Sequence, residues 1–333
     1  MRIHAGFGQA GYLDVLALLG FAEPAKLTPM MRAWDSLLDM MQPDLVIADH
    51  APALVPLLIA RGTPSIAIGN GFTLPPLCPV PFPPLYAARA PMVPEARLFA
   101  SLCQALTALG YAAPEDWQSA FSGGISPSNS QRLVVSFPEL DPYHGIRQEQ
   151  VFKPLDPLPD GATRPLGKRV FAYLGAELPG LNALLQSLTQ LDCEVECYVR
   201  GAPPNIYRFL DAQGVMVHQS PPDLAERLPL ASHVVSQGGT GMAHSALAAG
   251  RPHGIFALHG ESRLTAQALI ELGAGQIFPT GRDTQNCRDM LQTFLDDPDM
   301  PEAAMRAGRM VHGRDQPSGL KAVERALQSL MQS

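Results

Sequence analysis

The stretch of sequence that decides the fold is SHVVSQGGTGMAHSALAAGRPHGIFALHGESRLTAQALIELGAG, residues 232–275. A short β-branched run at 233–236 leads into a glycine turn, and apolar residues then recur at helical spacing up to Gly250. Gly250 and Pro252 end that helix, a second apolar run covers 254–258, and a further helix follows. This order predicts a βαβα unit.

Three glycines, Gly238, Gly239 and Gly241, lie between the first strand and its helix. Free backbone N–H groups and the positive end of the helix favour an anion there, usually a phosphate. The alternative is a purely structural turn that needs glycine for its backbone angles. The pattern is not a Rossmann dinucleotide fingerprint, which has G-x-G-x-x-G near the first strand and an acidic residue about 20 positions later.

The stretch resembles the donor-binding signature of the UDP-glycosyltransferase family among GT-B glycosyltransferases. That signature reads H-G-G-x-G-T-x-x-E-A-L-x-x-G-x-P, then a strand, D-Q, and a helix ending in G-x-G. The small and apolar positions match at Gly238, Gly239, Gly241, Ala246, Leu247, Gly250, Pro252, Gly273 and Gly275. The resemblance implies a two-domain fold whose C-terminal domain holds a nucleoside diphosphate sugar.

The polar positions of the signature are changed in this chain. Gln237 replaces the His expected to contact the donor diphosphate, and Met242 replaces the hydroxyl residue beside it. Ser245 stands where a ribose-binding Glu is usual, and Glu261 and Ser262 stand where the sugar-reading Asp-Gln is usual. Glu261 is also explained simply as a carboxylate in a first helical turn. The Gln237 amide can donate a neutral hydrogen bond but adds no positive charge.

Composition limits the class of protein. The 333 residues suit one large or two medium domains, and 46% hydrophobic with 17% charged residues is a globular composition. A net charge of −7 argues against a nucleic-acid or anionic-membrane surface. The absence of a long uncharged apolar run and of a signal-peptide pattern predicts a cytoplasmic protein without a transmembrane segment. The five scattered cysteines have no zinc-site spacing, so they are interpreted as reduced structural thiols and no metal is expected.

The first half of the chain also has an α/β pattern. Thr28-Pro29 predicts a helix start. Apolar runs at 45–48 and 65–68, with a helix at 53–60 between them, predict parallel strands and resemble the middle of the family's N-terminal domain. The segment before residue 43 is too short for the opening βα units, which need about 30 residues each. The proline-rich segment 72–94 is either a rigid surface loop or, because it is rich in aromatic residues, a wall of the acceptor pocket.

The fold class expected from these patterns is α/β of the GT-B type, with two facing Rossmann-like parallel-sheet domains, the first lacking its opening strands. The expected domains are residues 1–154, an N-terminal acceptor-side domain, and residues 168–333, the donor domain. The Pro- and Gly-rich segment 155–167 has the composition of a linker. A strand at 169–174 opens the donor domain, Gly175 follows it beside the expected nucleotide, and a helix at 320–331 closes the chain.

The general base of the family has no complete counterpart in this chain. The family takes it from a His in a G-H-x-x-P turn, and this chain has no such turn. Asp49 stands where the family keeps the Asp that orients that His, although a polar residue at a strand end needs no catalytic role. His50 is adjacent, so it projects to the opposite side of an extended chain and is a poor substitute.

The sequence therefore predicts a glycosyltransferase that moves a sugar from a UDP or dTDP sugar to a hydroxyl acceptor by metal-independent displacement, with slow turnover because the base is weak. The donor is a substrate, and no cofactor or nucleic acid is expected. One alternative is a catalytically silent or truncated homologue that binds only nucleotide or a protein partner. Another alternative is a UDP-sugar epimerase of the same fold, but the acidic and basic residues that such an enzyme needs are not identifiable in this chain. The expected donor-binding residues are Gly175, Gln237, Gly238, Gly239, Thr240, Gly241, Met242, Ser245, Glu261 and Ser262.

Overall fold

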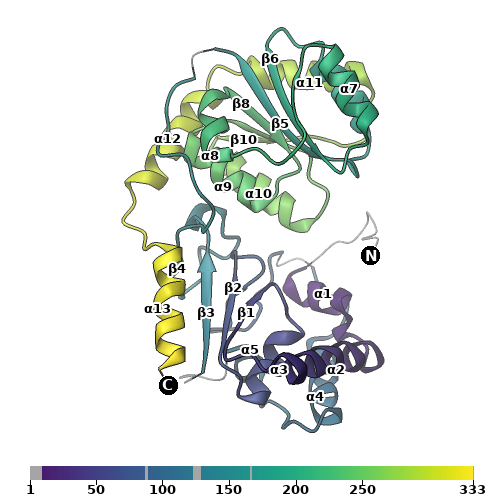
Figure 1. The fold of residues 1–333 in the computed structure, drawn as a ribbon, viewed down its shortest axis with the longest axis vertical. Coiled ribbons are helices and arrows are strands. Elements are labelled where there is room, and N and C mark those ends of the chain that lie inside the picture. Colours follow the sequence, from purple (N-terminus) through teal and green to yellow (C-terminus); the bar gives the residue numbers. More distant parts are fainter. Residues whose placement is uncertain (1–9, 87–88, 123–128, 166, 333) are drawn as a thin grey trace. The chain divides into compact units, whose positions relative to one another are not determined.

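The computed structural model describes residues 10–86, 89–122, 129–165 and 167–332, which form two compact α/β units (Figure 1). The second unit comprises Asp156–Asp315. The first unit combines the described residues up to Leu155 with those from Gln316 onward. Each unit is built on its own parallel sheet.

The second unit has a six-stranded sheet in the order β10-β9-β8-β5-β6-β7, and every neighbouring pair is parallel. Its strands are β5 (Arg169–Gly175), β6 (Glu194–Arg200), β7 (Met216–His218), β8 (His233–Ser236), β9 (His253–Ile255) and β10 (Gly275–Ile277). The order reverses between β5 and β8. Ligands of open α/β sheets bind beyond the carboxyl ends of the strands at such a switch point.

Helices cover both faces of this sheet because side chains alternate along each strand. Val170 and Leu174 of β5 belong to one buried cluster, whereas Phe171 belongs to another. The helices of the unit are α6 (Leu181–Leu188), α7 (Pro204–Ala212), α8 (Leu224–Arg227), α9 (Thr240–Ala249), α10 (Gly260–Glu271), α11 (Thr284–Leu295) and α12 (Met300–Gly313).

Helix α9 is buried from Met242 to Ala249, as its small and apolar residues require. Met242, Ala246 and Ala249 lie in one core cluster, which confirms the helical spacing seen in the sequence. Gly250 ends the helix with φ 70° in the left-handed region, as expected. A Cβ atom on Gly308 of α12 would lie 2.9 Å from the Cα of Gly250, so glycine allows these two helices to approach closely.

The first unit has a four-stranded parallel sheet in the order β1-β2-β3-β4. Its strands are β1 (Val46–Asp49), β2 (Ser65–Gly69), β3 (Ser130–Val135) and β4 (Val151–Phe152). Its helices are α1 (Tyr12–Leu16), a π-helical segment (Ala17–Phe21), α2 (Pro24–Met41), α3 (Leu54–Arg61), α4 (Glu95–Ala108), α5 (Trp117–Ser122) and α13 (Gly319–Met331). No helix in the described parts of the chain is long and apolar enough to span a membrane.

Two expectations about the first unit are wrong. Helix α2 begins at Pro24 rather than at residue 28, because Pro24 occupies a first-turn position that suits proline, and Pro29 lies inside the helix. The terminal helix α13 was expected in the donor domain, but it packs on the first sheet. Ala322, Ala326 and Leu330 of α13 share a buried cluster with Ile66, Ile68 and Leu133 of the first sheet.

The proline-rich segment after β2 is packed inward rather than exposed. Phe72, Leu74, Leu77 and Phe82 are all less than 10% exposed. The Phe82 ring lies 5.5 Å from that of Tyr12 and 5.4 Å from that of Phe121, measured between ring centroids. Burial of these rings argues against the surface-loop interpretation.

Candidate functional site

A pocket of about 700 Å³ opens at the carboxyl end of the second sheet. This volume lies within the range of small-molecule sites. Its lining comes from the strand ends of β5, β6 and β8, the start of α9, the segment before α8, the start of α10, and the segment that contains Asp156. The lining residues include Asp156, Glu177, Arg200, Asp223, Ser236, Gln237, Gly239, Thr240, Gly241, Met242, Ser245 and His259.

Two adjacent glycines in the turn before α9 have different reasons to be glycine. Gly238 has φ 76°, and a Cβ atom there would lie 2.6 Å from Cγ2 of Ile255, so the fold itself requires glycine. Gly239 has φ −62° and ψ 140°, which any residue adopts. A Cβ atom on Gly239 would meet no described atom within 4 Å. Of these two glycines, only Gly239 faces open space at the pocket and has no structural need to be glycine.

The amino terminus of α9 opens into this pocket. Gly239 is the N-cap residue, and no side chain in the described chain caps the helix. The first N–H groups of a helix have no partner within it, and the helix dipole places partial positive charge there. The backbone N–H groups at the start of α9 are thus arranged in a way that suits anion binding.

Three polar side chains lie together where β8 ends and β9 begins. The Ser236 hydroxyl accepts a hydrogen bond from the backbone N–H of Gly238 at 2.9 Å, and it lies 2.7 Å from Nε2 of His253. Burial lowers the pKa of His253 to about 3, so its imidazole is neutral. Nδ1 of His253 and Nε2 of Gln237 are buried and have no hydrogen-bond partner in the described chain.

Charged side chains at the pocket do not supply free positive charge. Arg200 at the end of β6 pairs with Glu177 at 2.6 Å. Asp223 accepts a hydrogen bond from the backbone N–H of Ala225 and caps α8. Asp156 lies beside the start of α9, where its Oδ2 would be 3.2 Å from a Cβ atom on Gly241. An anion in this pocket therefore relies on neutral donors.

Of the ten donor-binding residues expected from sequence, six line the pocket: Gln237, Gly239, Thr240, Gly241, Met242 and Ser245. The other four, Gly175, Gly238, Glu261 and Ser262, do not line it. Gly175 ends β5 next to the lining residue Leu174.

The two residues expected to read the sugar have structural contacts instead. Glu261 accepts a hydrogen bond from the Thr240 hydroxyl at 2.9 Å, which links α10 to α9. Ser262 is fully buried and forms a capping box with His259 at the start of α10. His259 itself lines the pocket, so it lies at the site although it matches no family position.

In the first unit, Asp49 is exposed at the end of β1, and no described side chain forms a hydrogen bond with it. His50 has φ 41°, an uncommon angle for a residue other than glycine. It lines a small cavity of about 10 Å³, and Asp49 is not among the residues that line this cavity. The His50 ring lies 6.4 Å from that of Tyr12.

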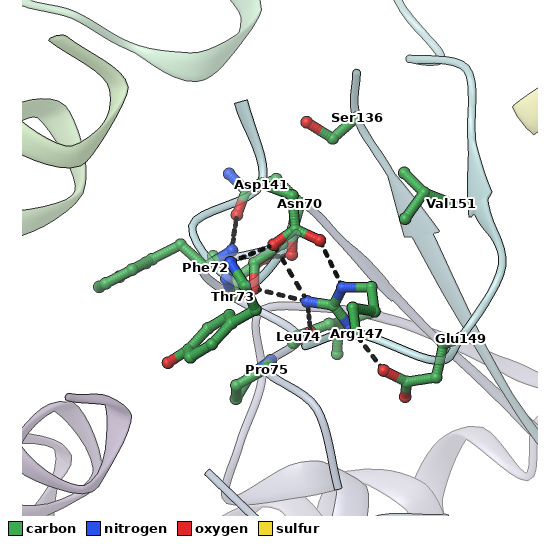
Figure 2. A network of polar contacts seen from close by, with 12 residues as sticks. Asn70, Phe72, Thr73, Leu74, Pro75, Ser136, Asp141, Arg147, Glu149 and Val151 are labelled. Carbon is green, nitrogen blue, oxygen red and sulfur yellow. Dashed lines mark hydrogen bonds and ion pairs between the residues drawn. The ribbon is translucent and has the colours of Figure 1, made fainter. Parts of the chain in front are cut away.

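Buried charges hold the loops that follow β2 and β3 in the first unit. The Arg147 side chain is 1% exposed, and it pairs with Asp141, which is fully buried, and with Glu149 at 2.6 Å. It also donates hydrogen bonds to the carbonyl oxygens of Gly71 at 3.0 Å and Leu74 at 2.9 Å. Figure 2 shows the guanidinium between these two loops. These contacts form the Arg147 network, which fixes the segment after β2.

Several pocket residues escaped the sequence interpretation. Ser236 and Arg200 each end a strand of a parallel sheet, and that position alone was a usable signal. Asp156 and Asp223 lie in irregular segments, and nothing in their local sequence brings them to the pocket. No group of three or more His, Cys, Asp or Glu side chains in the described ranges is arranged to hold a metal ion.

No family model and no curated protein matches the chain. Solved structures do match it. The glycosyltransferase VinC, in complex with dTDP, has a TM-score of 0.59 at 18% identity, over 96% of this chain and 80% of VinC. The glycosyltransferase SsfS6 from Streptomyces sp. SF2575 has a TM-score of 0.61 at 17% identity, over 98% of this chain and 80% of SsfS6.

The calicheamicin glycosyltransferase CalG4 has a TM-score of 0.63 at 20% identity, over 95% of this chain and 80% of CalG4. These neighbours are GT-B glycosyltransferases, in agreement with the resemblance seen in the sequence. The chain has their fold, with parallel-sheet α/β domains of four and six strands.

Proposed function

We propose that this chain is a glycosyltransferase that binds a nucleoside diphosphate sugar of the UDP or dTDP type in the pocket of its second unit. In this proposal the sugar passes to a hydroxyl acceptor by direct displacement without a metal ion. The observation that most supports this proposal is the position of Gly239. This residue faces the pocket at an uncapped helix start, and no neighbouring atom or backbone angle requires glycine there. Close approach of a ligand to the backbone explains glycine at such a position.

Structural neighbours support the choice of ligand. The VinC structure is a complex with dTDP, and SsfS6 has been solved with thymidine diphosphate. A diphosphate leaving group needs its developing charge stabilised. The proposal assigns this role to the N–H groups at the start of α9 and to the Gln237 amide. Ser245 lines the same pocket and is the proposed contact for the ribose.

The proposal gives no sugar-reading role to Glu261 or Ser262, because neither lines the pocket. Asp49 remains the proposed base, at the exposed end of β1. An unassisted carboxylate is a weak base toward an alcohol, and a well-placed base contributes about 10²–10⁴-fold to such reactions. The chain is accordingly expected to turn over slowly.

Nucleotide titration tests the donor proposal. Isothermal titration calorimetry with UDP and dTDP should give saturable binding, and Gly239→Val should reduce the affinity about 100-fold or more, because a branched side chain would occupy the anion position. The matched control is Gly161→Val. Gly161 also has open space around its Cβ position and does not line the pocket. Equal binding by Gly239→Val and the parent would place the site elsewhere.

Turnover is measured separately, as sugar transfer or donor hydrolysis with a panel of nucleotide sugars and phenolic, lipid and macrolide-like acceptors. Turnover on the order of 1 per second or more would contradict the weak-base part of the proposal. A nucleotide-binding protein without turnover is the second candidate function. It is favoured by the lack of a hydrogen-bond partner for Asp49 in the described chain and by the replacement of the expected His with Gln237. Tight nucleotide binding with no detectable transfer or hydrolysis would support it.

A further inference from the structure

Ser236 occupies an unusual position at the edge of the pocket. The residue is 2% exposed, yet it lines the pocket at the end of β8. Its oxygen accepts the N–H of Gly238 at 2.9 Å and lies 2.7 Å from His253 Nε2. A serine hydroxyl has two acceptor lone pairs and one proton to donate. What that proton does depends on the tautomer of His253.

The tautomer follows from the surroundings of the ring. Nδ1 of His253 is buried and has no partner in the described chain. In one neutral tautomer Nδ1 carries the hydrogen, and in the other it carries a lone pair. A buried N–H without an acceptor is rarer in proteins than an under-used acceptor. We assign the hydrogen to Nε2, which then donates to Ser236. The two lone pairs of the serine oxygen are thereby used, one by Gly238 and one by His253.

We infer that Ser236 is a diphosphate-binding residue whose hydroxyl donates its hydrogen bond into the pocket, and that His253 is a positioning residue that orients it. This inference deepens the proposed function and rests on it. The ligand group is a phosphate oxygen of a nucleoside diphosphate, because the pocket at this point is bordered by the anion-binding start of α9.

The chemistry of the pocket fits this role. Arg200 is already paired with Glu177, and Asp156 and Asp223 add negative charge to the lining. Neutral donors are therefore the means of holding an anion here. Ser236 and Gln237 are consecutive, and the buried Gln237 amide nitrogen has no partner in the described chain. Together they supply two side-chain donors next to the backbone donors of α9.

A phosphate contact should be seen with ligands that contain phosphate and not with those that lack it. Ser236→Ala is titrated with UDP, dTDP, inorganic pyrophosphate and the nucleosides uridine and thymidine. A hydrogen bond to a charged group predicts a loss of about 10- to 100-fold for the diphosphates and pyrophosphate. Nucleoside affinity should stay unchanged. Ser236→Thr, which keeps the hydroxyl and suits a strand, should restore binding to within a few fold.

The matched control is Ser232→Ala. Ser232 is a buried serine directly before the same strand, and its hydroxyl bonds to the Arg169 backbone away from the pocket. It should leave every affinity unchanged. His253→Leu, which removes the orienting donor, should weaken diphosphate binding about 3- to 10-fold, and His253→Gln, which keeps an N–H donor, should recover most of it.

The outcomes separate the inference from the proposed function. If the parent binds diphosphates and Ser236→Ala binds them with the same affinity, the inference is overturned and the proposed function stands. Equal losses for diphosphates and nucleosides also overturn it, because the effect would then be a distorted pocket. Binding of pyrophosphate but of no nucleotide, with the loss in Ser236→Ala, supports the phosphate contact and overturns the nucleotide-sugar function. No binding of either by the parent overturns both.

Discussion

The two parallel sheets of this protein differ in what lies beyond their carboxyl ends. Beyond β2 and β3, the Arg147 network joins the two loops through buried charges, and a small cavity of about 10 Å³ nearby is lined in part by aromatic side chains. Beyond β5 and β8, a pocket of about 700 Å³ remains, and the polar groups without a partner at its edge, in Gln237 and His253, are neutral. Buried charges are satisfied internally where the loops must hold a shape. Unused neutral donors remain where a ligand is proposed to bind.

The same contrast extends to titratable groups. Burial lowers the pKa of His233 to about 4 and of His244 and His253 to about 3, and all three lie in the second unit. In the unfolded chain the same histidines titrate near 6.5. Between about pH 6.5 and these folded values, the unfolded state binds more protons, so the stability of the second unit falls as the pH falls.

Acidification should thus produce the largest effect and should separate the units. From pH 7 to pH 5 the second unit should lose up to about 2 kcal/mol for each of the three histidines. Both tryptophans, Trp34 and Trp117, lie in the first unit and report on it selectively. The urea midpoint followed by far-ultraviolet circular dichroism should drop more than the midpoint followed by tryptophan fluorescence. Equal shifts would contradict the contrast, and His244→Leu should remove about a third of the acid sensitivity.

Removing the centre of the Arg147 network should be the next largest change. Arg147→Met leaves the fully buried Asp141 without its cation, and breaking a buried pair in this way costs about 3–5 kcal/mol. Urea unfolding followed by tryptophan fluorescence measures the loss. Nucleotide affinity in the second unit should not change. The control, Arg164→Met, removes an exposed pair with Glu302 and should cost less than about 1 kcal/mol. Similar losses in both variants would show that the network is not a special feature.

Adding a positive charge to the pocket should have a smaller effect. In Gln237→His, a protonated imidazole would add a charge-assisted hydrogen bond to the phosphate. Nucleotide affinity should then rise about tenfold from pH 8 to pH 5.5, after allowance for the titration of the phosphate measured in the parent. The measurement is calorimetry at the two pH values. The same affinity at both would argue that residue 237 does not contact the phosphate.

Removing a charge from the pocket should have the smallest effect of the series. Asp156 is exposed and lies beside the start of α9, so its carboxylate repels a bound diphosphate through solvent. Asp156→Asn should strengthen UDP or dTDP binding about two- to fivefold at low salt, and the gain should shrink at high salt. Asp160→Asn, outside the pocket lining, serves as the control. A weaker affinity in Asp156→Asn would mean that Asp156 accepts a hydrogen bond from the ligand.

Local sequence was sufficient for the framework of the second unit. The glycine turn, the small residues of α9 and the stop at Gly250 are encoded by neighbours in the chain, because backbone angles and helical spacing are local properties. The strand ends at Asp49 and Gly175 followed from apolar runs for the same reason. Six of the ten expected donor-binding residues line the pocket, since they belong to this one local motif.

Tertiary structure decided the remaining features of the fold and the site, because these features depend on contacts between residues far apart in sequence. Only the folded chain shows α13 packed on the first sheet, where its apolar face meets Ile66 and Ile68. Only the folded chain uses Ser262 as a helix cap and brings Ser236 to His253, 17 positions away. The distinction between Gly238 and Gly239 has the same origin. The sequence contains two adjacent glycines, but the side chain of Ile255 fills the space beside one of them and leaves the other open.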